Sequence, residues 1–271
     1  MKVGFIGLGT QGRYLAVNLA KAGYDLMVYD VRDEPLQELA AAGAKIARTN
    51  REVGEHAEIV EICVVDDAQI EAVVLGAGGV LEGAKPGSII VIHSTVHPRT
   101  ITKVAKAAAA RGIEVSDVPV SGSEAGAKNR TMCYMVGATA QAFERCRPLF
   151  ATSGSDIIHT GGPGAGIRAK LAHQVIICLN MLSAFEGMEL GVKAGVAPEV
   201  LEQVIHGGHA QSRVADNWSK FNPGRHSVGI FYKDLRVALE FAHELGITMP
   251  GTALTQQLIE RILRLDRMEN S

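Results

Sequence analysis

Short apolar runs alternate with amphipathic stretches through the first 160 residues of the chain. The runs are brief and nearly uninterrupted by polar residues, which is typical of strands buried on both faces of a sheet. We expect such strands at residues 2–6, 26–29, 59–65, 88–92, 114–118, 132–136 and 156–159. We expect helices at residues 10–21, 33–42, 67–75 and 98–111. The alternation predicts a parallel sheet that is covered by helices on both faces.

The pattern changes at Gly161-Gly162-Pro163-Gly164, and no convincing strand follows. A long helix is predicted over 165–194, because the apolar positions 171, 175, 178, 182 and 185 step by four and three residues. We expect further helices at residues 198–205, 211–220, 231–245 and 253–267, and a frayed tail after about residue 265. The sequence therefore predicts an α/β domain over 1–160 and an all-helical domain over 161–271, joined by the long helix.

Composition excludes several classes of protein. The 271 residues are 47% apolar and 21% charged, which is ordinary for a globular chain. Lys and Arg number 27 against 29 Asp and Glu, a net charge of -2, so a nucleic-acid partner is not expected. The longest uncharged apolar stretch, 171–185, contains His173, Gln174, Asn180 and Ser183. We interpret it as a buried helix, too short and too polar to span a membrane.

The cysteines indicate a reducing compartment. Cys63, Cys133, Cys146 and Cys178 show no close pairing, so we interpret them as small buried apolar residues. The chain opens on the first strand-like run without a preceding signal segment. We therefore expect a cytoplasmic protein.

A glycine-rich motif follows the first predicted strand and opens the first predicted helix. The motif has the spacing G-x-G-x-x-G and reads Gly7-Leu8-Gly9-Thr10-Gln11-Gly12. In this context the glycines allow a tight turn, approach of the backbone to a pyrophosphate, and close packing of the helix on the strand. Asp30 stands 18 residues after Gly12, where an acidic side chain can bind a ribose. The motif predicts a doubly wound, Rossmann-type domain that binds a dinucleotide; a glycine-rich turn without a ligand is the alternative.

Asp30 also bears on the choice of dinucleotide. A carboxylate accepts hydrogen bonds from ribose hydroxyls and repels a 2′-phosphate, and the neighbouring Val31 cannot pair with that phosphate. Arg32 could pair with it if the loop turned the side chain inward. NAD is therefore favoured over NADP. We expect Val64 and Val65, at the end of the run 59–65, to pass close to a ribose of the cofactor.

Several segments carry a family resemblance over nearly the whole chain. The opening 4–9, with Asn18-Leu19 and Gly23-Tyr24, resembles the β-hydroxyacid dehydrogenases, which include 3-hydroxyisobutyrate, tartronate semialdehyde and 6-phosphogluconate dehydrogenases. Tyr29-Asp30-Val31 is similar to the NAD-using members. His93-Ser94-Thr95 is similar to the family's Ser-Thr segment near the nicotinamide, and 117–122 to its substrate-binding motif. Gly164-Ala165-Gly166 with Lys170 is similar to its catalytic-lysine motif, and 231–235 to a late motif whose lysine, here Lys233, lies near cofactor and substrate.

The resemblance implies a function. It implies hydride transfer between the nicotinamide cofactor and a small β-hydroxyacid, or reduction of the matching semialdehyde, with Lys170 as general base or acid. A free lysine has a pKa of about 10.4, so a base working near pH 7–8 needs burial and neighbouring positive charge, here the nicotinamide ring and Lys233. The resemblance also favours a homodimer or homotetramer.

The expected substrate site combines an anion anchor with polar groups on the long helix. Ser121 and the backbone N–H groups of Gly122 and Ser123 can form a small concavity for a carboxylate. The family usually has glycine where this chain has Ser123, and asparagine where it has Gln174. Gln174 could donate to the substrate hydroxyl. His173, three residues after Lys170 as in the 6-phosphogluconate branch, is either a substrate contact or a structural histidine.

Other interpretations stay open. An oxidative decarboxylase is suggested by His173, but Ile177 stands where that branch has an acidic residue, and the chain is too short for it. An imine reductase would usually lack Lys170, as would a dinucleotide sensor without catalysis. His206 and His209, with Gln211 and Arg213 nearby, could border the substrate pocket or simply connect helices. No acidic or cysteine residue accompanies the two histidines in the sequence nearby, so we expect no metal site.

Overall fold

We describe the fold from a computed structural model, which places residues 1–221 and 225–263. The chain divides into two compact units, Met1–Lys170 (unit 1) and Leu171–Ser271 (unit 2). The sequence pattern predicted a boundary near residue 160, where the helical pattern begins. The division by contacts falls instead within one helix, α9 (Ala165–Lys193), whose first residues pack in unit 1.

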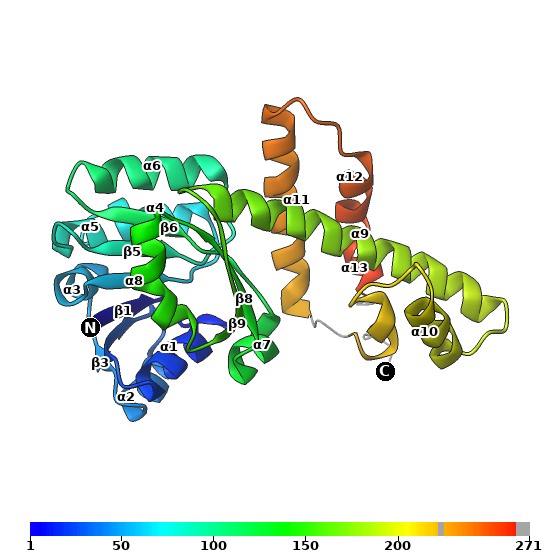
Figure 1. Ribbon diagram of the computed structural model, residues 1–271, viewed down its shortest axis with the longest axis horizontal. Helices are drawn as coiled ribbons and strands as arrows, with labels where there is room; N and C mark the ends of the chain where they lie inside the picture. Colours follow the sequence, from blue (N-terminus) through cyan, green and yellow to red (C-terminus); the bar gives the residue numbers. More distant parts are fainter. Residues whose placement is uncertain (222–224, 264–271) are drawn as a thin grey trace. The chain divides into compact units, whose positions relative to one another are not determined.

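Unit 1 is built on a nine-stranded sheet with the order β3-β2-β1-β4-β5-β6-β8-β7, and β9 pairs with β8 (Figure 1). The strands are β1 (Lys2–Ile6), β2 (Asp25–Tyr29), β3 (Lys45–Ile46), β4 (Ile59–Ile62), β5 (Ile89–Ile92), β6 (Glu114–Asp117), β7 (Val120–Ser121), β8 (Met132–Gly137) and β9 (Gly154–Gly161). β1 to β6 are parallel, which confirms the predicted parallel sheet over its larger part.

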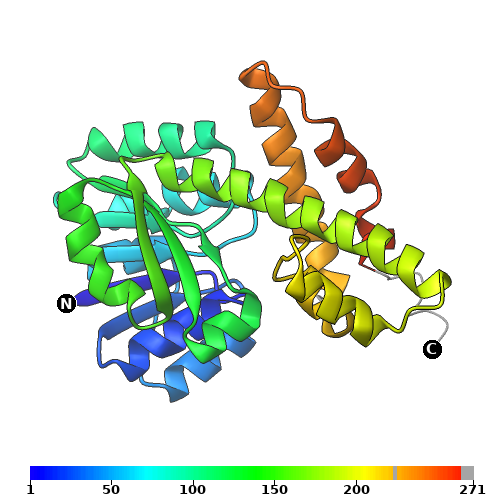
Figure 2. The same ribbon diagram turned by 45° about the vertical axis from the view of Figure 1, so that its right-hand side comes forward.

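The remaining edge of the sheet corrects the prediction. β8 runs antiparallel to β6 and β7 and parallel to β9, which lies beside it in Figure 2. A buried strand has the same apolar pattern in either direction, so the pattern could not give the direction. The short helix α7 (Ser123–Asn129) connects β7 to the antiparallel β8.

Helices cover both faces of the sheet. The others in unit 1 are α1 (Gly12–Lys21), α2 (Asp33–Ala41), α3 (Asn50–His56), α4 (Asp67–Leu75), α5 (Val80–Gly83), α6 (Pro98–Ala109) and α8 (Ala140–Phe150). Alternate strand residues enter different cores: Ile89 and Val91 pack with α1, α2 and α8, whereas Ile90 and Ile92 pack with α3 to α6. This two-sided burial explains why β4 and β5 are apolar throughout except for Glu61.

Unit 2 contains helices and no strand among its described residues. They are most of α9, then α10 (Pro198–Gly207), the 3₁₀ helix η1 (Ala215–Lys220), α11 (Arg225–Glu244), α12 (Pro250–Gln257) and α13 (Ile259–Ile262). The helix expected over 211–220 is only the 3₁₀ segment, because Asn217 leaves helical geometry at φ -132°. The helix expected from 253 starts earlier, at Pro250, whose ring suits a first helical turn, and it breaks at Leu258. Residues 264–271, where we expected its end and a frayed tail, lie outside the described residues.

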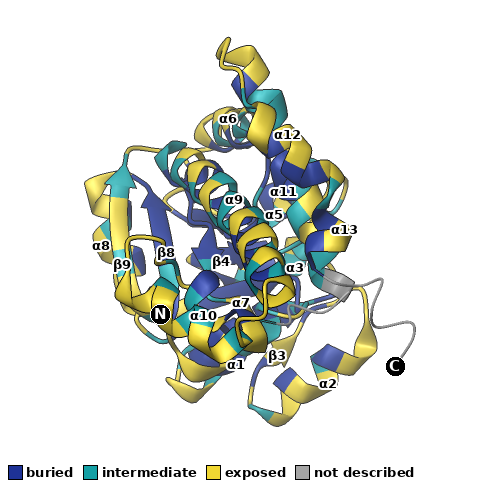
Figure 3. Cartoon of the chain, turned by 90° about the vertical axis from the view of Figure 1, so that its right-hand side faces the viewer, coloured by how far each residue is buried: buried dark blue, intermediate teal, exposed yellow. Residues whose placement is uncertain are grey.

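The long helix is less buried than we expected. Met181, Ala184 and Met188 pack in the core of unit 2 with Trp218. Ile176 and Leu190 are exposed, and exposed turns occur along much of α9 (Figure 3). By length and composition alone α9 is long and apolar enough to cross a membrane, a test that many helices of soluble proteins also meet. Our expectation concerned only 171–185, and α9 extends beyond that stretch at both ends.

Candidate active site

The glycine-rich loop connects β1 to α1 as predicted. Gly7 has φ +92°, its N–H donates to the Tyr29 carbonyl at 3.0 Å, and a side chain there would strike the Cys63 carbonyl. A side chain at Gly12 would strike the Gly7 carbonyl, so α1 can start this close to β1 only with glycine. Gly9 instead faces open space, with no atom within 4 Å of the position that a Cβ would take. That space is what a pyrophosphate approaching the backbone requires.

Asp30 organises the same loop. One carboxylate oxygen accepts from the Leu8 N–H at 2.6 Å, and the other accepts from the Arg32 backbone N–H at 2.9 Å and its Nε at 3.0 Å. Burial alone would raise the pKa of Asp30, but these hydrogen bonds outweigh it and the pKa is lowered. Arg32 turns toward Asp30, although its side chain stays 56% exposed, and Val31 is 88% exposed. A cavity of about 190 Å³ lies over this region and is lined by Leu8, Gly9, Thr10, Arg13, Arg32, Glu34, Pro35, Glu38 and Glu124.

Two further predicted segments meet beside the loop, at the carboxyl ends of neighbouring strands. The buried Ser94 hydroxyl, after β5, donates to the Val64 carbonyl at 2.7 Å and accepts from the Val64 N–H at 3.0 Å. Val65 is exposed, and Thr95 follows Ser94. In parallel sheets ligands bind at this edge, where the strand order reverses, here between β1 and β4. The structure therefore brings together the residues predicted to bind the cofactor, apart from Lys233 in unit 2.

His93, next to Ser94 in the chain, forms a buried pair with Glu61 of β4. Nε2 of His93 is 2.9 Å from Glu61 Oε2, and Nδ1 is 2.8 Å from the Val118 carbonyl oxygen. A carbonyl can only accept, so Nδ1 carries a proton. The bond between Nε2 and Glu61 then contains a single proton, as either imidazolium–carboxylate or imidazole–carboxylic acid. The pair ties β4 and β5 to the segment that follows β6.

The anchor residues follow that segment. Ser121 ends β7, opposite Cys133 of β8. Gly122 has φ +146° and Ser123 has φ +59°, so two successive residues have positive φ. Glu124 accepts from Arg13 of α1 at 3.3 Å, which links the start of α7 to the helix that follows the glycine-rich loop. The predicted anchor and the predicted cofactor loop are thus neighbours within unit 1.

Lys170 reaches the same segment from α9. It is buried, 6% exposed, and its Nζ donates to the Val120 carbonyl at 2.8 Å, one residue before Ser121. Burial removes the hydration that stabilises an ammonium group. Asp117, three residues before Val120, is fully buried and accepts from the N–H groups of Gly164 and Ile167 at the start of α9.

In unit 2 a second polar group contains three predicted site residues. Gln174 is buried, and its amide donates to Asp234 Oδ2 of α11 at 2.6 Å. Nδ1 of His173 lies 3.1 Å from Gln174 Oε1, and Lys233 Nζ lies 3.0 Å from Asp234 Oδ1. Asp234 therefore holds Gln174 and Lys233 together.

Comparison with known proteins gives a consistent result. Residues 2–161 match the NAD binding domain of 6-phosphogluconate dehydrogenase, and residues 164–269 match the NAD-binding family of NADP-dependent 3-hydroxyisobutyrate dehydrogenase. The 2-(hydroxymethyl)glutarate dehydrogenase of Eubacterium barkeri is 35% identical over 100% of this chain and 93% of its own. The 2-hydroxy-3-oxopropionate reductase of Escherichia coli is 37% identical over 95% and 90%.

The chain belongs to the β-hydroxyacid dehydrogenase family. It is an oxidoreductase that transfers hydride between a nicotinamide cofactor and the CH–OH group of a small β-hydroxyacid. The fold agrees: the solved structure of 3-hydroxyisobutyrate dehydrogenase from Mycobacterium tuberculosis with L-serine has a TM-score of 0.87 and 25% identity, covering 96% of this chain and 92% of that one.

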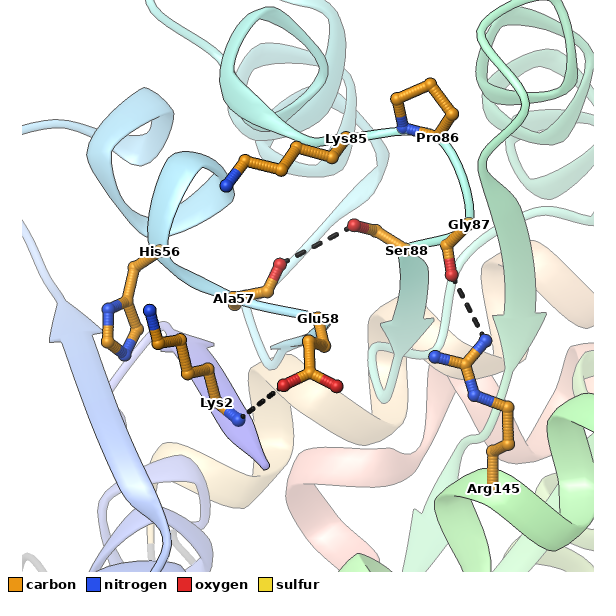
Figure 4. A pocket seen from close by; sticks show the side chains of 9 residues that line it. All are labelled: Lys2, His56, Ala57, Glu58, Lys85, Pro86, Gly87, Ser88 and Arg145. Carbon is orange, nitrogen blue, oxygen red and sulfur yellow. Dashed lines mark hydrogen bonds between the residues drawn. The ribbon is translucent and has the colours of Figure 1, made fainter.

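A separate cavity of about 440 Å³ in the dehydrogenase lies away from these groups (Figure 4). It opens at the amino ends of β1, β4 and β5, the opposite edge of the sheet from the glycine-rich loop. Lys2, His56, Lys85 and Arg145 line it together with Glu58. None of the predicted site residues lies there.

The dehydrogenase also has site residues that the sequence did not reveal. Asp117 lies within the motif 117–122, but the sequence pattern indicates no role for its side chain, nor for those of Asp234, Glu61 and His93. The one signal in the sequence was Glu61, a charge inside the apolar run 59–65. His206, expected to lack an acidic neighbour, lies 3.5 Å from Asp216 Oδ2. The described residues hold no group of three metal-binding side chains of the His, Cys, Asp and Glu types.

Proposed function

We propose that the dehydrogenase oxidises a small β-hydroxyacid with NAD, and reduces the matching semialdehyde in reverse, with Lys170 as the general base and acid. The observation that carries this proposal is the buried Lys170, which donates to the Val120 carbonyl immediately before the Ser121–Ser123 loop. A proton acceptor thereby lies beside an anion-binding loop.

The glycine-rich loop fits the cofactor, because the open space above Gly9 admits a phosphate against the backbone. When bound, the nicotinamide ring accepts or donates the hydride. The residues that would hold the cofactor are Gly7, Leu8, Gly9, Thr10, Gln11, Gly12, Asp30, Val31, Val64, Val65, Ser94, Thr95 and Lys233.

NAD is favoured by the position of Asp30. Its carboxylate is held at the end of β2 by the Leu8 N–H, where it can accept from a ribose hydroxyl and repels a 2′-phosphate. Arg32 neutralises part of that charge. The protein therefore discriminates against NADP less strongly than it would with Asp30 alone. Arg32→Ala should therefore raise the preference for NAD over NADP.

The protein's own residues orient the substrate and move one proton. In unit 1, Ser121 and the N–H groups of Gly122 and Ser123 bind the carboxylate. In unit 2, Gln174, His173 and Lys233, which the family resemblance implies as substrate contacts, form a polar group around Asp234. Neutral Lys170 accepts the hydroxyl proton at Nζ as the hydride leaves, and returns it during reduction. Burial favours the neutral amine that this step needs.

The test is NADH formation by the purified protein at mildly alkaline pH with a panel of β-hydroxyacids. NAD and NADP are compared side by side, with Lys170→Ala as the catalytic control. We expect turnover that is faster with NAD and falls by about 10²–10⁴-fold in Lys170→Ala. Turnover that survives in the variant would overturn the role of Lys170, and a preference for NADP would overturn the role of Asp30.

We further propose a homodimer or homotetramer in the cytoplasm, with neither membrane nor nucleic acid as a partner. The support for an oligomer is a set of exposed apolar side chains on α9 and α10, namely Ile176, Leu190, Val192, Val200 and Val204. Light scattering should give a multiple of the monomer mass, and Leu190→Glu should lower it. A monomer at micromolar concentration would contradict this proposal.

A further inference from the structure

Asp117 supplies a helix cap from a distant part of the chain. It ends β6, and its two oxygens accept from the Gly164 N–H at 2.5 Å and the Ile167 N–H at 2.6 Å. N–H groups at the start of a helix have no partner inside the helix, so an acceptor must come from elsewhere. Here the acceptor lies 47 and 50 residues earlier in the sequence.

The same short segment also holds the far end of the Lys170 side chain. Val120, three residues after Asp117, accepts from Lys170 Nζ at 2.8 Å. Between them, Val118 donates to the Ile92 carbonyl at 2.8 Å and accepts from His93, so the segment is fixed to β5. Residues 117–120 therefore hold both the backbone that carries Lys170 and its ammonium group.

The junction has no spare room. A side chain at Gly166 would strike the carbonyls of Asp117 and Met135, and one at Gly137 would come within 2.5 Å of Asp117 Oδ1 and of the Gly166 N–H. The start of α9 thus lies directly against β6 and β8. A change in the cap therefore cannot be absorbed without moving the helix.

We propose that Asp117 is a positioning residue for Lys170: by capping α9 it holds the helix start at the depth where the amine meets the Val120 carbonyl beside the anchor loop. This proposal rests on the proposed role of Lys170 as the base. Asp117 acts through Lys170 and requires no contact of its own with substrate.

The presence of a carboxylate at position 117 indicates that the cap does more than stabilise the fold. Burial raises the pKa of Asp117 to about 6, against the opposing effect of its N–H donors and of the Arg168 charge, so the ionised form is costly to bury. The side-chain caps of other helices in unit 1 are local to their helices: Thr49 on α3, Asp66 on α4, His97 on α6 and Thr139 on α8. A buried carboxylate at α9 fixes two N–H groups at once, which a hydroxyl does not.

The test compares Asp117→Asn with the matched cap variant Thr49→Ala, using pH profiles of kcat/KM and the affinity for NADH. In Asp117→Asn, the side-chain NH₂ faces one of the two backbone N–H groups. Two donors cannot form a hydrogen bond, so the start of α9 shifts. We expect kcat to fall by about 100-fold, as for a misplacement of about 1 Å. The kinetic pKa of the base should rise toward that of a free lysine, about 10.4, as Lys170 leaves its buried position. NADH affinity should be unchanged, and Thr49→Ala should change neither kcat nor the profile.

The direction of the pKa change distinguishes the explanations. Loss of a negative charge by itself would lower the pKa of a nearby lysine, and a purely structural cap would leave it unmoved. Either result, or an unchanged kcat, overturns the proposal. Burial raises the pKa of Cys133 against the opposing effect of the Lys170 charge, so the neighbouring thiol adds no negative charge near neutral pH.

Two more variants keep the test decisive. If Asp117→Asn does not fold, Gly166→Ala disturbs the same junction from the helix side and should give the same fall in kcat and rise in the base pKa. Lys170→Met separates the two proposals: full turnover in this variant removes the proposed function itself. An inactive Lys170→Met together with a wild-type profile in both junction variants removes only the role of Asp117.

Discussion

The backbone at Ser123 has a conformation that serine does not favour. Its φ of +59° is a left-handed conformation that costs a residue with a side chain roughly 1–2 kcal/mol. Glycine avoids that cost but loses more chain entropy, roughly 0.5–1 kcal/mol. Ser123→Gly should therefore be about 0.5–1 kcal/mol more stable in urea unfolding, and Ser123→Ala should gain nothing. A loss of stability in Ser123→Gly would show that the Ser123 hydroxyl stabilises the fold by more than the backbone strain destabilises it.

Asp117 makes a prediction about stability and pH. Its pKa is about 6 in the fold against an ordinary value of 3.8, so between these values the native state holds a proton that the unfolded chain has released. The contribution of Asp117 to stability is therefore greatest below about pH 4 and falls as the pH rises to about 6. The free energy of unfolding of the wild type, relative to Asp117→Asn, should drop by about 3 kcal/mol over this range. A difference that is constant with pH would contradict the raised pKa.

The structure brings predicted site residues together where the sequence carries a local signal. Gly7, Gly9, Gly12 and Asp30 have fixed spacings around one strand–turn–helix unit, and the structure brings them together. The partners of Asp117 and Gln174 are 47 and 60 residues away, at distances that no spacing rule covers. Such contacts come from the packing of elements, which the sequence pattern alone does not give.

At the scale of elements, the loop between β1 and α1 separates a folding requirement from a binding requirement. A side chain at Gly9 meets no protein atom, so Gly9→Ala should change the free energy of unfolding little while occupying space that the cofactor needs. We expect NADH affinity to fall at least tenfold in a fluorescence titration. Gly187→Ala, also free of close contacts but on α9, is the matched control and should bind normally.

Elements were predictable where they were long or fully buried. Each expected strand is present within a few residues, and α4 has the predicted bounds. The hydrophobic pattern did not reveal β3, α3, α5, β7, α7 and α8. The two missed strands have only two residues each, and α3 and α7 have seven, too short for a periodicity to emerge. α8 is longer, but it contains Pro148, which normally marks the end of a helix.

At the scale of the molecule, each unit has its own hydrophobic cores, two in unit 1 and two in unit 2 among the described residues. We expect calorimetric unfolding to depart from two-state behaviour, with a calorimetric enthalpy above the van't Hoff value. NADH at a hundredfold excess over its Kd should stabilise the transition of unit 1 by about 2.7 kcal/mol. Equal enthalpies and one ligand-sensitive transition would contradict independent units.

The long-range cap on α9 also orders events during synthesis. Asp117 leaves the ribosome 47 residues before Gly164, its first backbone partner. At roughly 5–20 residues per second this interval is about 2–9 seconds. In that time β1 to β6 are already complete, while the carboxylate that will hold α9 still faces water. The nascent chain can thus assemble its dinucleotide-binding strands first, and the helix that carries Lys170 docks afterwards.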